Sequence, residues 1–200
     1  MSGPRIGLAF DRGHEGRKGF VMKVLVAYAS KYGATQGIAE RIGDVLRRRG
    51  LEVDVKPCKD VDDATGYDAY VIGSAVYEFN WRKDARKLVE RSAEELAAHP
   101  TWLFSSGPVG TETVDKEGHD VLKGAEPKQF AEYEDRIRPR GKQVFRGAYD
   151  HAKIRGGDRI IAWMPAIRDI LPEGDFREWD AIEGWANSIA DELSKQSARA

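Results

Sequence analysis

The feature that most constrains the fold is an apolar segment that stops at a loop of small and hydroxyl-bearing residues. Residues Lys23–Ala29 are mostly apolar, which is typical of a strand buried on both faces. The loop Ser30–Thr35 follows, and apolar residues recur at helical spacing from Ile38 onward. A strand that enters a helix this way presents free backbone N–H groups at the helix start. The segment therefore predicts either a phosphate site or an ordinary turn with a Ser/Thr helix cap.

The glycine spacing of this loop excludes two common nucleotide-binding motifs. The loop lacks the G-x-G-x-x-G pattern of dinucleotide sites and the G-x-x-x-x-G-K-[ST] pattern of triphosphate sites. What remains is Ser30-x-Tyr32-Gly33-x-Thr35, with a hydroxyl at each end. Such a loop suits a terminal monophosphate. This segment alone does not distinguish that phosphate site from a plain helix cap.

Predicted strands and helices alternate along the rest of the chain. Further strands are expected at 51–55, 69–74, 102–106 and 142–149, and helices at 84–96, 129–137 and 180–193. The polar stretch 111–128 is predicted to be a surface loop. This alternation predicts an α/β fold in which helices cover both faces of a parallel sheet.

Two more loops of small residues follow predicted strands, at 75–81 and 107–110. In open parallel sheets a ligand binds outside the carboxyl ends of the strands. The three loops are therefore expected to converge on one crevice. This convergence favours the phosphate-site interpretation of Ser30–Thr35 over the plain helix cap.

Composition narrows the function further. We expect one domain at 22–195, preceded by a flexible or extra leader at 1–21. The net charge of −1 argues against a nucleic-acid partner. The single cysteine, Cys58, is interpreted as a structural thiol.

No histidine lies at metal-ligand spacing, so no metal site is predicted. No segment has the ~20 apolar residues of a membrane span, so we expect a cytoplasmic protein with at most peripheral contact with the inner face of the membrane.

The residues resemble the flavodoxin family. The resemblance rests on Val24-x-Val26-x-Tyr28-x-Ser30-x-Tyr32-Gly33-x-Thr35, Tyr67-Asp68-x-Tyr70-Val71-Ile72-Gly73-Ser74 and Phe104-Ser105-Ser106-Gly107. It implies a flavodoxin-like three-layer sandwich with a five-stranded parallel sheet in the order 2-1-3-4-5. The second half is similar to the flavodoxin-type, menaquinone-dependent protoporphyrinogen oxidases and their actinobacterial relatives. That similarity rests on Val144–Tyr149, Asp158-Arg159, Gly174-Asp175-x-Arg177-x-Trp179 and Trp185-Ala186.

The resemblance implies FMN as the cofactor, although a deazaflavin phosphate would use the same loop. The implied phosphate site comprises Ser30, Lys31, Tyr32, Gly33, Ala34, Thr35 and Gln36. The implied ring site comprises Ser74, Ala75, Val76, Tyr77, Ser105, Ser106, Gly107, Pro108 and Val109. Tyr77 and Trp81 are the candidates to stack on the flavin, and the alternative for both is hydrophobic cover of the next helix.

The second loop departs from that of electron-carrier flavodoxins. In those proteins a peptide beside the flavin flips on reduction, commonly at a glycine, which tolerates positive φ. Residues 74–81 contain no glycine. The sequence therefore predicts poor stabilisation of a one-electron-reduced flavin and a bias to two-electron chemistry.

The function implied by the resemblance is that of an FMN-dependent oxidoreductase. Its most specific form oxidises protoporphyrinogen IX in heme biosynthesis and passes electrons to a quinone. The alternatives are a non-catalytic electron carrier that docks to a redox protein and a regulatory or binding domain. No catalytic acid or base is assigned. Basic residues proposed to meet porphyrin carboxylates are Arg146, Lys153, Arg155 and Arg159. The apolar stretch 159–171 is interpreted either as a quinone- or membrane-facing surface or as a packed connector.

Overall fold

The computed structural model describes residues 21–150, 152 and 172–197. Its centre is a sheet in which five parallel strands follow the order β2-β1-β3-β5-β6. These strands are β1 (Lys23–Ala29), β2 (Glu52–Pro57), β3 (Ala69–Tyr77), β5 (Thr101–Ser106) and β6 (Gly141–Phe145). The predicted order 2-1-3-4-5 is confirmed, because β5 and β6 are the fourth and fifth parallel strands along the chain. The short β4 (Asn80–Trp81) pairs antiparallel with β3.

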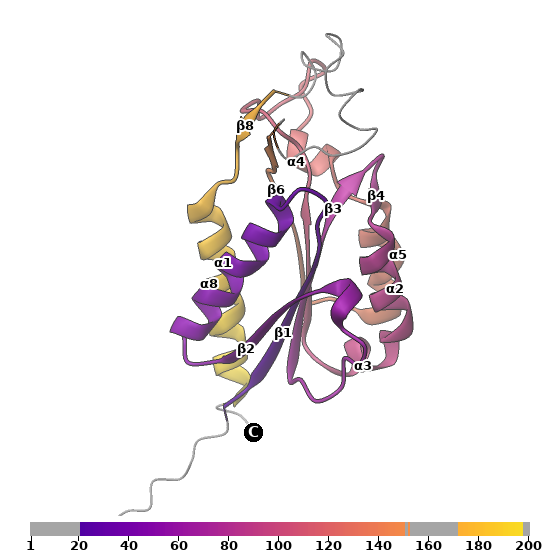
Figure 1. Ribbon diagram of the computed structural model, residues 1–200, viewed down its shortest axis with the longest axis vertical. Helices are drawn as coiled ribbons and strands as arrows, with labels where there is room; N and C mark the ends of the chain where they lie inside the picture. The colour runs from indigo at the N-terminus through magenta and orange to yellow at the C-terminus, as the bar shows by residue number, and fades with distance from the viewer. Residues whose placement is uncertain (1–20, 151, 153–171, 198–200) are drawn as a thin grey trace, which may run out of the picture.

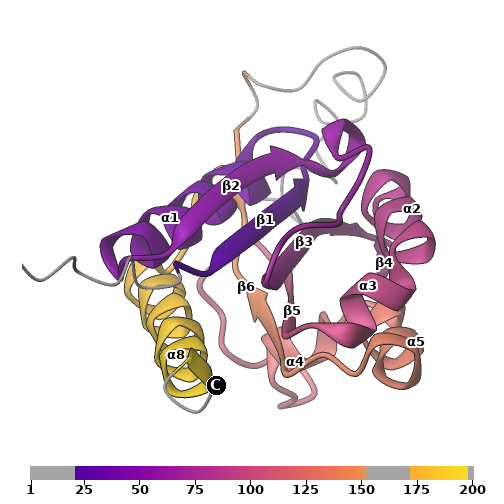
Figure 2. The ribbon, with the colours of Figure 1, turned by 90° about the horizontal axis from the view of Figure 1, so that it is seen from below.

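Helices cover both faces of the sheet, as the predicted three-layer sandwich requires (Figures 1 and 2). One face carries α1 (Ala34–Arg48) and α8 (Trp179–Ser197), and the other carries α2 (Lys83–Arg91), α3 (Ala93–Ala98) and α5 (Lys128–Ile137). The remaining elements are η1 (Cys58–Asp60), α4 (Val121–Gly124), β7 (Ala148–Tyr149) and β8 (Gly174–Asp175).

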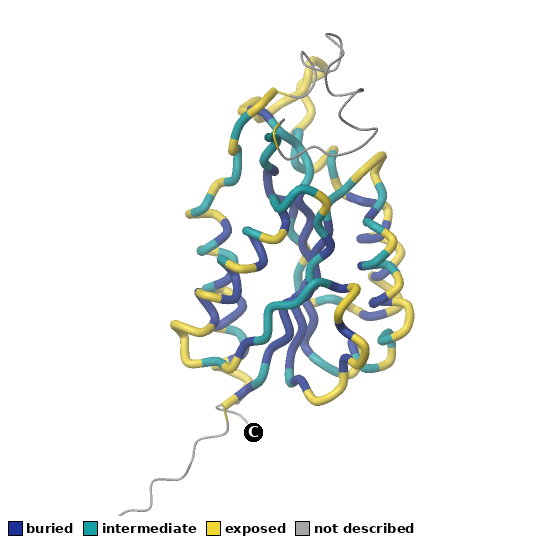
Figure 3. The backbone as a smooth tube through the Cα atoms, viewed as in Figure 1, coloured by how far each residue is buried: buried dark blue, intermediate teal, exposed yellow. Residues whose placement is uncertain are grey.

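The apolar side chains of β1 pack into two hydrophobic cores, one on each face of the sheet. Val24 and Val26 pack with α1 and α8, whereas Leu25 and Ala27 pack on the opposite face. Successive side chains of a strand point to opposite faces, so a strand covered on both sides must be apolar throughout. Figure 3 shows the resulting buried centre, with most exposed residues on outer helix faces and in loops.

Four predicted elements differ from the structure. The helix expected at 84–96 breaks at Ser92 into α2 and α3. The strand expected at 142–149 ends at Phe145, and Ala148–Tyr149 pairs with β8 instead of continuing the sheet. The loop expected at 75–81 is largely a hairpin, in which β3 continues to Tyr77 and returns as β4. The polar stretch 111–128 includes α4, whose N-cap Asp120 accepts hydrogen bonds from the backbone N–H groups of Leu122 and Lys123.

The sheet order brings the predicted loops together. Because β1, β3 and β5 are parallel neighbours, the loops at their carboxyl ends lie at one edge of the sheet, at the upper end of Figure 1. The leader predicted at 1–21 lies, apart from Val21, outside the described residues. The stretch 159–171 and the basic residues Lys153, Arg155 and Arg159 also lie outside them.

Candidate functional site

The first loop joins β1 to α1 through a left-handed glycine. Gly33 is the N-cap of α1 with φ 91°, a conformation that favours glycine. Its N–H donates to Oγ of Ser30 at 3.0 Å, and its carbonyl accepts from the N–H of Gly37 at 3.0 Å. Among the described residues, no side chain makes a cap hydrogen bond at the start of α1. The helix therefore begins without the hydroxyl cap that the plain-turn interpretation needs.

Thr35 offers a hydroxyl that nothing in the described structure satisfies. The residue is fully buried in the first turn of α1, and its Oγ1 has no hydrogen-bond partner among the described residues. A buried polar atom without a partner is costly. A phosphate at the start of α1 would supply the missing acceptor and would also meet the free N–H groups of the first turn.

The second loop is held by Ser74 rather than lined by it. Ser74 is buried, and its Oγ accepts a hydrogen bond from the N–H of Arg82 at 2.9 Å and donates to the carbonyl of Ala75 at 2.8 Å. The contact with Arg82 ties the two ends of the hairpin together. The residues that follow Ser74, from Ala75 to Glu78, line the crevice.

The third loop follows β5 and is fixed by the chain beyond β6. The N–H of Gly107 donates to the carbonyl of Phe145 at 3.2 Å, and the N–H of Gly147 donates to the carbonyl of Pro108 at 2.9 Å. Ser105 is buried, and its Oγ accepts from Nε1 of Trp81 at 2.8 Å. Ser105 thus braces the hairpin in the same way as Ser74.

Trp81 does not line the crevice. Its side chain is buried beside Phe130 and Tyr133, with ring centroids 6.0 and 5.8 Å apart in edge-to-face geometry. The alternative, hydrophobic cover of the neighbouring helices, describes its position. Tyr77 in contrast is about half exposed and lines the crevice.

The three loops enclose a crevice of about 300 Å³. Its lining includes most of the predicted residues, namely Ser30, Lys31, Tyr32, Ala34, Thr35, Ala75, Val76, Tyr77, Ser106, Gly107, Pro108 and Val109. Gly33 and Gln36 instead line an adjoining hollow of about 250 Å³, which shares Ser30 and Lys31 with the crevice. Lys31 links two walls, because its Nζ lies 5.2 Å from the ring centre of Tyr32 and 5.9 Å from that of Tyr77.

A fourth wall was missed by the sequence analysis. Gly147, Ala148 and Tyr149 line the crevice beside the third loop, and Glu78 joins the second. The missed signal was the end of the fifth parallel strand. Had the strand been ended at Phe145, the carboxyl-end rule would have placed the residues after it at the same edge as the other loops.

Arg146 supports the site from inside and does not face a substrate. It is buried, and its guanidinium donates to the carbonyls of Gly110 at 2.7 Å and Glu112 at 2.6 Å. The expectation that Arg146 meets porphyrin carboxylates is therefore wrong in this structure. The reason is the bend after Phe145, which turns the side chain toward the third loop.

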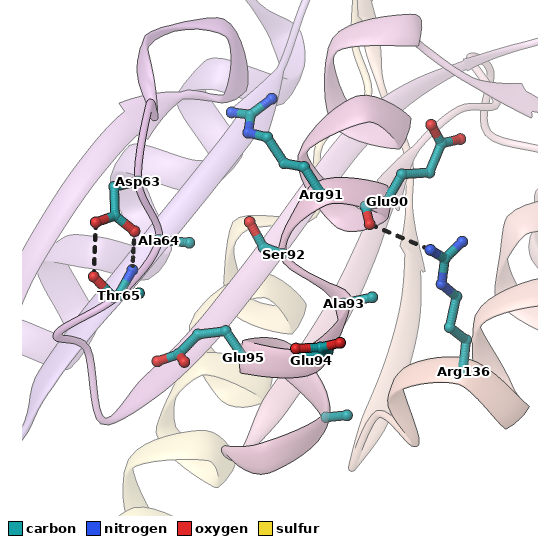
Figure 4. A pocket seen from close by; sticks show the side chains of 11 residues that line it. Asp63, Ala64, Thr65, Glu90, Arg91, Ser92, Ala93, Glu94, Glu95 and Arg136 are labelled. Atoms are coloured by element: carbon teal, nitrogen blue, oxygen red, sulfur yellow. Dashed lines mark hydrogen bonds between the residues drawn. The ribbon is translucent and has the colours of Figure 1, made fainter.

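A larger hollow, of about 710 Å³, lies at the opposite end of the sheet (Figure 4). It separates the segment Asp63–Thr65 from α2 and α3. Its polar groups bind one another: Asp63 accepts from the N–H and the hydroxyl of Thr65, each at 2.8 Å, and Arg136 donates to the carbonyl of Glu90 at 3.2 Å. The hollow lies away from the strand-end loops, so we assign it no ligand.

Other reactive groups of the described residues do not form a site. Cys58 is buried, and burial, with a smaller effect of the Asp84 carboxylate, raises the pKa of its thiol from 9.0 to about 12. The described residues contain no cluster of three or more His, Cys, Asp or Glu able to hold a metal ion. Among the helices of 21–150 and 172–197, none is both long and apolar enough to span a bilayer.

The comparison with protein families shows to which family the chain belongs. The model of the family described as "Flavodoxin domain" matches residues 25–169. The chain belongs to the flavodoxin domain family. This confirms the resemblance, and membership of this family implies FMN as the cofactor. The unpartnered Thr35 hydroxyl and the first turn of α1 fit its phosphate, and the apolar walls from Val76 and Val109 fit its ring.

Curated relatives and solved structures agree with this flavodoxin assignment. Protoporphyrinogen IX dehydrogenase (quinone) of Escherichia coli strain K12 is 22% identical over 176 residues, which cover 84% of this chain and 95% of the relative. A flavodoxin from the domain Archaea matches with a TM-score of 0.54 and 18% identity, over 86% of this chain and 99% of that chain. Oxidised flavodoxin 2 from Bacillus cereus matches with a TM-score of 0.54 and 19% identity, over 85% and 99%.

One further structural relative is a larger enzyme. The rubredoxin oxygen:oxidoreductase of Desulfovibrio gigas matches with a TM-score of 0.57 and 13% identity, over 89% of this chain. The flavodoxin domain described here spans only 37% of that chain. At such identities these structures establish the fold, while the chemistry must be argued from the crevice itself.

Proposed function

We propose that this flavodoxin-domain protein is an FMN-dependent oxidoreductase that oxidises protoporphyrinogen IX and passes the electrons to a quinone. The flavin supplies the electron transfer, and the protein supplies binding, orientation and exclusion of water. The similarity to the protoporphyrinogen IX dehydrogenase (quinone) of Escherichia coli supports the substrate and the acceptor.

The observation that carries the proposal is the closed second loop. Val76 pairs with Trp81, and Tyr77 pairs with Asn80, in a short antiparallel ladder. A peptide flip at Val76 or Tyr77 would have to disturb this ladder. The absence of glycine from residues 74–81 makes the flip costlier still. Both features favour two-electron transfer over the one-electron transfer of carrier flavodoxins.

The residues of the crevice have distinct tasks in this proposal. The loop Ser30–Thr35 binds the phosphate through backbone N–H groups and the Thr35 hydroxyl. Tyr77 and Val76 cover one side of the ring, and Pro108 and Val109 cover another part of it. Arg146 and Gly147 hold the third loop in place through backbone carbonyls. No residue is assigned as a proton donor or acceptor.

The alternative is a non-catalytic electron carrier, which the matches to nearly full-length flavodoxins favour. The test begins with FMN-loaded protein under anaerobic conditions. We expect protoporphyrinogen to bleach the oxidised flavin and menadione, a soluble quinone, to restore its absorbance. A carrier would fail this cycle and would accumulate the one-electron-reduced flavin in high yield during a redox titration.

A further inference from the structure

The segment 174–177 is bonded to two different walls of the crevice. At its start β8 pairs with β7, and the N–H of Phe176 donates to the carbonyl of Gly147 at 3.1 Å, on the fourth wall. At its end Nη1 of Arg177 donates to the carbonyl of Ala34 at 3.4 Å. Ala34 belongs to the first turn of α1 and also lines the crevice. The segment therefore joins the fourth wall to the phosphate loop.

The guanidinium of Arg177 is held firmly against the first turn of α1. The carboxylate of Asp175 accepts from Nε at 2.7 Å and from Nη2 at 2.6 Å, and Cζ lies 4.4 Å from the ring centre of Trp179. Nη1 fills the space beside Gly37, where a Cβ would lie only 2.4 Å from it. A glycine within a helix costs about 0.8–1 kcal/mol relative to alanine. Gly37 therefore weakens α1 and in return leaves room for the guanidinium.

The charge at this end of α1 is the opposite of what the helix alone favours. The start of a helix favours acidic side chains, yet the first turn of α1 contains none. The charged group that bonds to this turn is instead the cation of Arg177. Thr35, whose buried hydroxyl has no partner among the described residues, lies in the same turn. A bound phosphate would supply both the acceptor for Thr35 and the negative charge.

We propose that Arg177 is a positioning residue for the phosphate of the flavin. It is not among the residues that line the crevice or the adjoining hollow, and Asp175 balances its charge. We therefore assign it no contact with the ligand. It holds the first turn of α1 in place relative to the wall at Gly147, so that the N–H groups and the Thr35 hydroxyl meet the phosphate already ordered. This role concerns FMN binding and does not depend on which substrate the flavin oxidises.

The test titrates apoprotein with FMN and with riboflavin, which lacks the phosphate, and follows the quenching of flavin fluorescence. We expect Arg177→Met to weaken FMN binding by about fivefold to tenfold, because the ligand must then order the turn. Riboflavin binding should change by less than about twofold, whereas a merely structural role would weaken both flavins equally. Arg177→Lys should behave like Arg177→Met, because lysine lacks the planar fork that bonds Asp175 twice.

Arg41→Met is the matched control. Cζ of Arg41 lies 5.0 Å from the ring centre of the same Trp179, and Nη1 donates to Glu183 at 2.6 Å. The variant removes a cation from that ring and an ion pair between α1 and α8, but it leaves the contact between Arg177 and Ala34. It should lower the free energy of unfolding of the apoprotein, while its FMN affinity stays within about twofold of the wild type.

Asp175→Asn separates the position of Arg177 from its charge. The variant removes a negative charge near the phosphate loop, so a purely electrostatic role of Arg177 predicts tighter FMN binding. A positioning role predicts weaker binding, as in Arg177→Met, because the guanidinium is no longer held. Tighter binding in Asp175→Asn, wild-type FMN affinity in Arg177→Met, or equal losses for FMN and riboflavin would each overturn the proposal. None of these measurements uses turnover, so a failure to oxidise protoporphyrinogen would leave it standing.

Discussion

The guanidinium of Arg177 occupies the space that a side chain on Gly37 would need. A Cβ built on Gly37 would lie 2.4 Å from Nη1 of Arg177. Arg177 is held there by two hydrogen bonds to the carboxylate of Asp175, at 2.7 and 2.6 Å, and its Cζ lies 4.4 Å from the ring centre of Trp179. The segment after β8 is thereby joined to the first turn of α1, which carries Thr35.

This contact predicts an unusual result for Gly37→Ala. In an exposed helix this change stabilises by about 0.8–1 kcal/mol, but here it must displace Arg177 from Asp175 and Trp179. We expect no net gain in the free energy of unfolding in the wild-type background. In the Arg177→Ala background, Gly37→Ala should raise the free energy of unfolding by the full amount expected for an exposed helix. Urea unfolding of the four proteins in this cycle measures the coupling, and equal effects of Gly37→Ala in both backgrounds would refute the contact.

Thr35→Val tests the phosphate site. The change keeps the shape of the side chain and removes a buried hydroxyl that has no partner among the described residues. The apoprotein should be as stable as the wild type or more so, whereas FMN should bind about 10- to 100-fold more weakly, because a hydrogen bond to a charged group is lost. Thr101→Val is the control: its hydroxyl already donates to the carbonyl of Leu96 at 2.9 Å. It should lose stability but keep its FMN affinity.

Arg146→Met tests whether the third loop depends on a buried cation. The variant removes both donors to the carbonyls of Gly110 and Glu112. We expect a loss of about 2 kcal/mol in the free energy of unfolding and weaker FMN binding. Arg136→Met is the control, because it removes an exposed hydrogen bond from Arg136 to the carbonyl of Glu90. It should lower the free energy of unfolding by less than about 0.5 kcal/mol. Wild-type behaviour of Arg146→Met in chemical unfolding would contradict this role.

The buried thiol of Cys58 predicts a dependence on alkaline pH. Burial raises its pKa from 9.0 to about 12 in the folded protein, and its charged form is the deprotonated one. Above about pH 9 the unfolded chain therefore loses this proton while the folded chain keeps it, so stability falls as pH rises, by at most about 1.4 kcal/mol per pH unit. The stability difference between wild type and Cys58→Ala should shrink by about 1 kcal/mol from pH 8 to pH 10. If the stability difference between the two proteins were the same at pH 8 and pH 10, folding would not raise the pKa of the Cys58 thiol.

Replacing the hairpin tip by its preferred residues should stabilise the protein. In Glu78→Asn, Phe79→Gly both left-handed positions receive residues that tolerate positive φ. We expect a gain of about 1–2 kcal/mol in the free energy of unfolding. Arg138→Gly, at the left-handed end of α5, should give a similar gain per residue. A destabilised double variant would mean that the tip is not strained.

Local patterns were enough to predict the sheet and its loops. The apolar run of β1, the helical spacing from Ile38 and the small residues after each strand depend on neighbours along the chain. They predicted a parallel sheet covered by helices, whereas the strand order was implied by the resemblance to flavodoxins. The directions in which individual side chains point were harder to predict from the sequence. The resemblance implied that Ser74 and Ser105 contact the ring, yet their hydroxyls are bonded to the hairpin, at Arg82 and Trp81 respectively.

The sequence by itself determined the α/β architecture and the loops at the strand ends, because strand and helix periodicity act at short range. The order of the parallel strands was implied by the resemblance to flavodoxins. Only the tertiary structure decided that Tyr149 forms a wall of the crevice, that Arg146 turns inward and that Arg177 excludes a side chain at Gly37. Each of these contacts joins residues that are distant in the chain. Their geometry depends on how the layers pack, which no local pattern records.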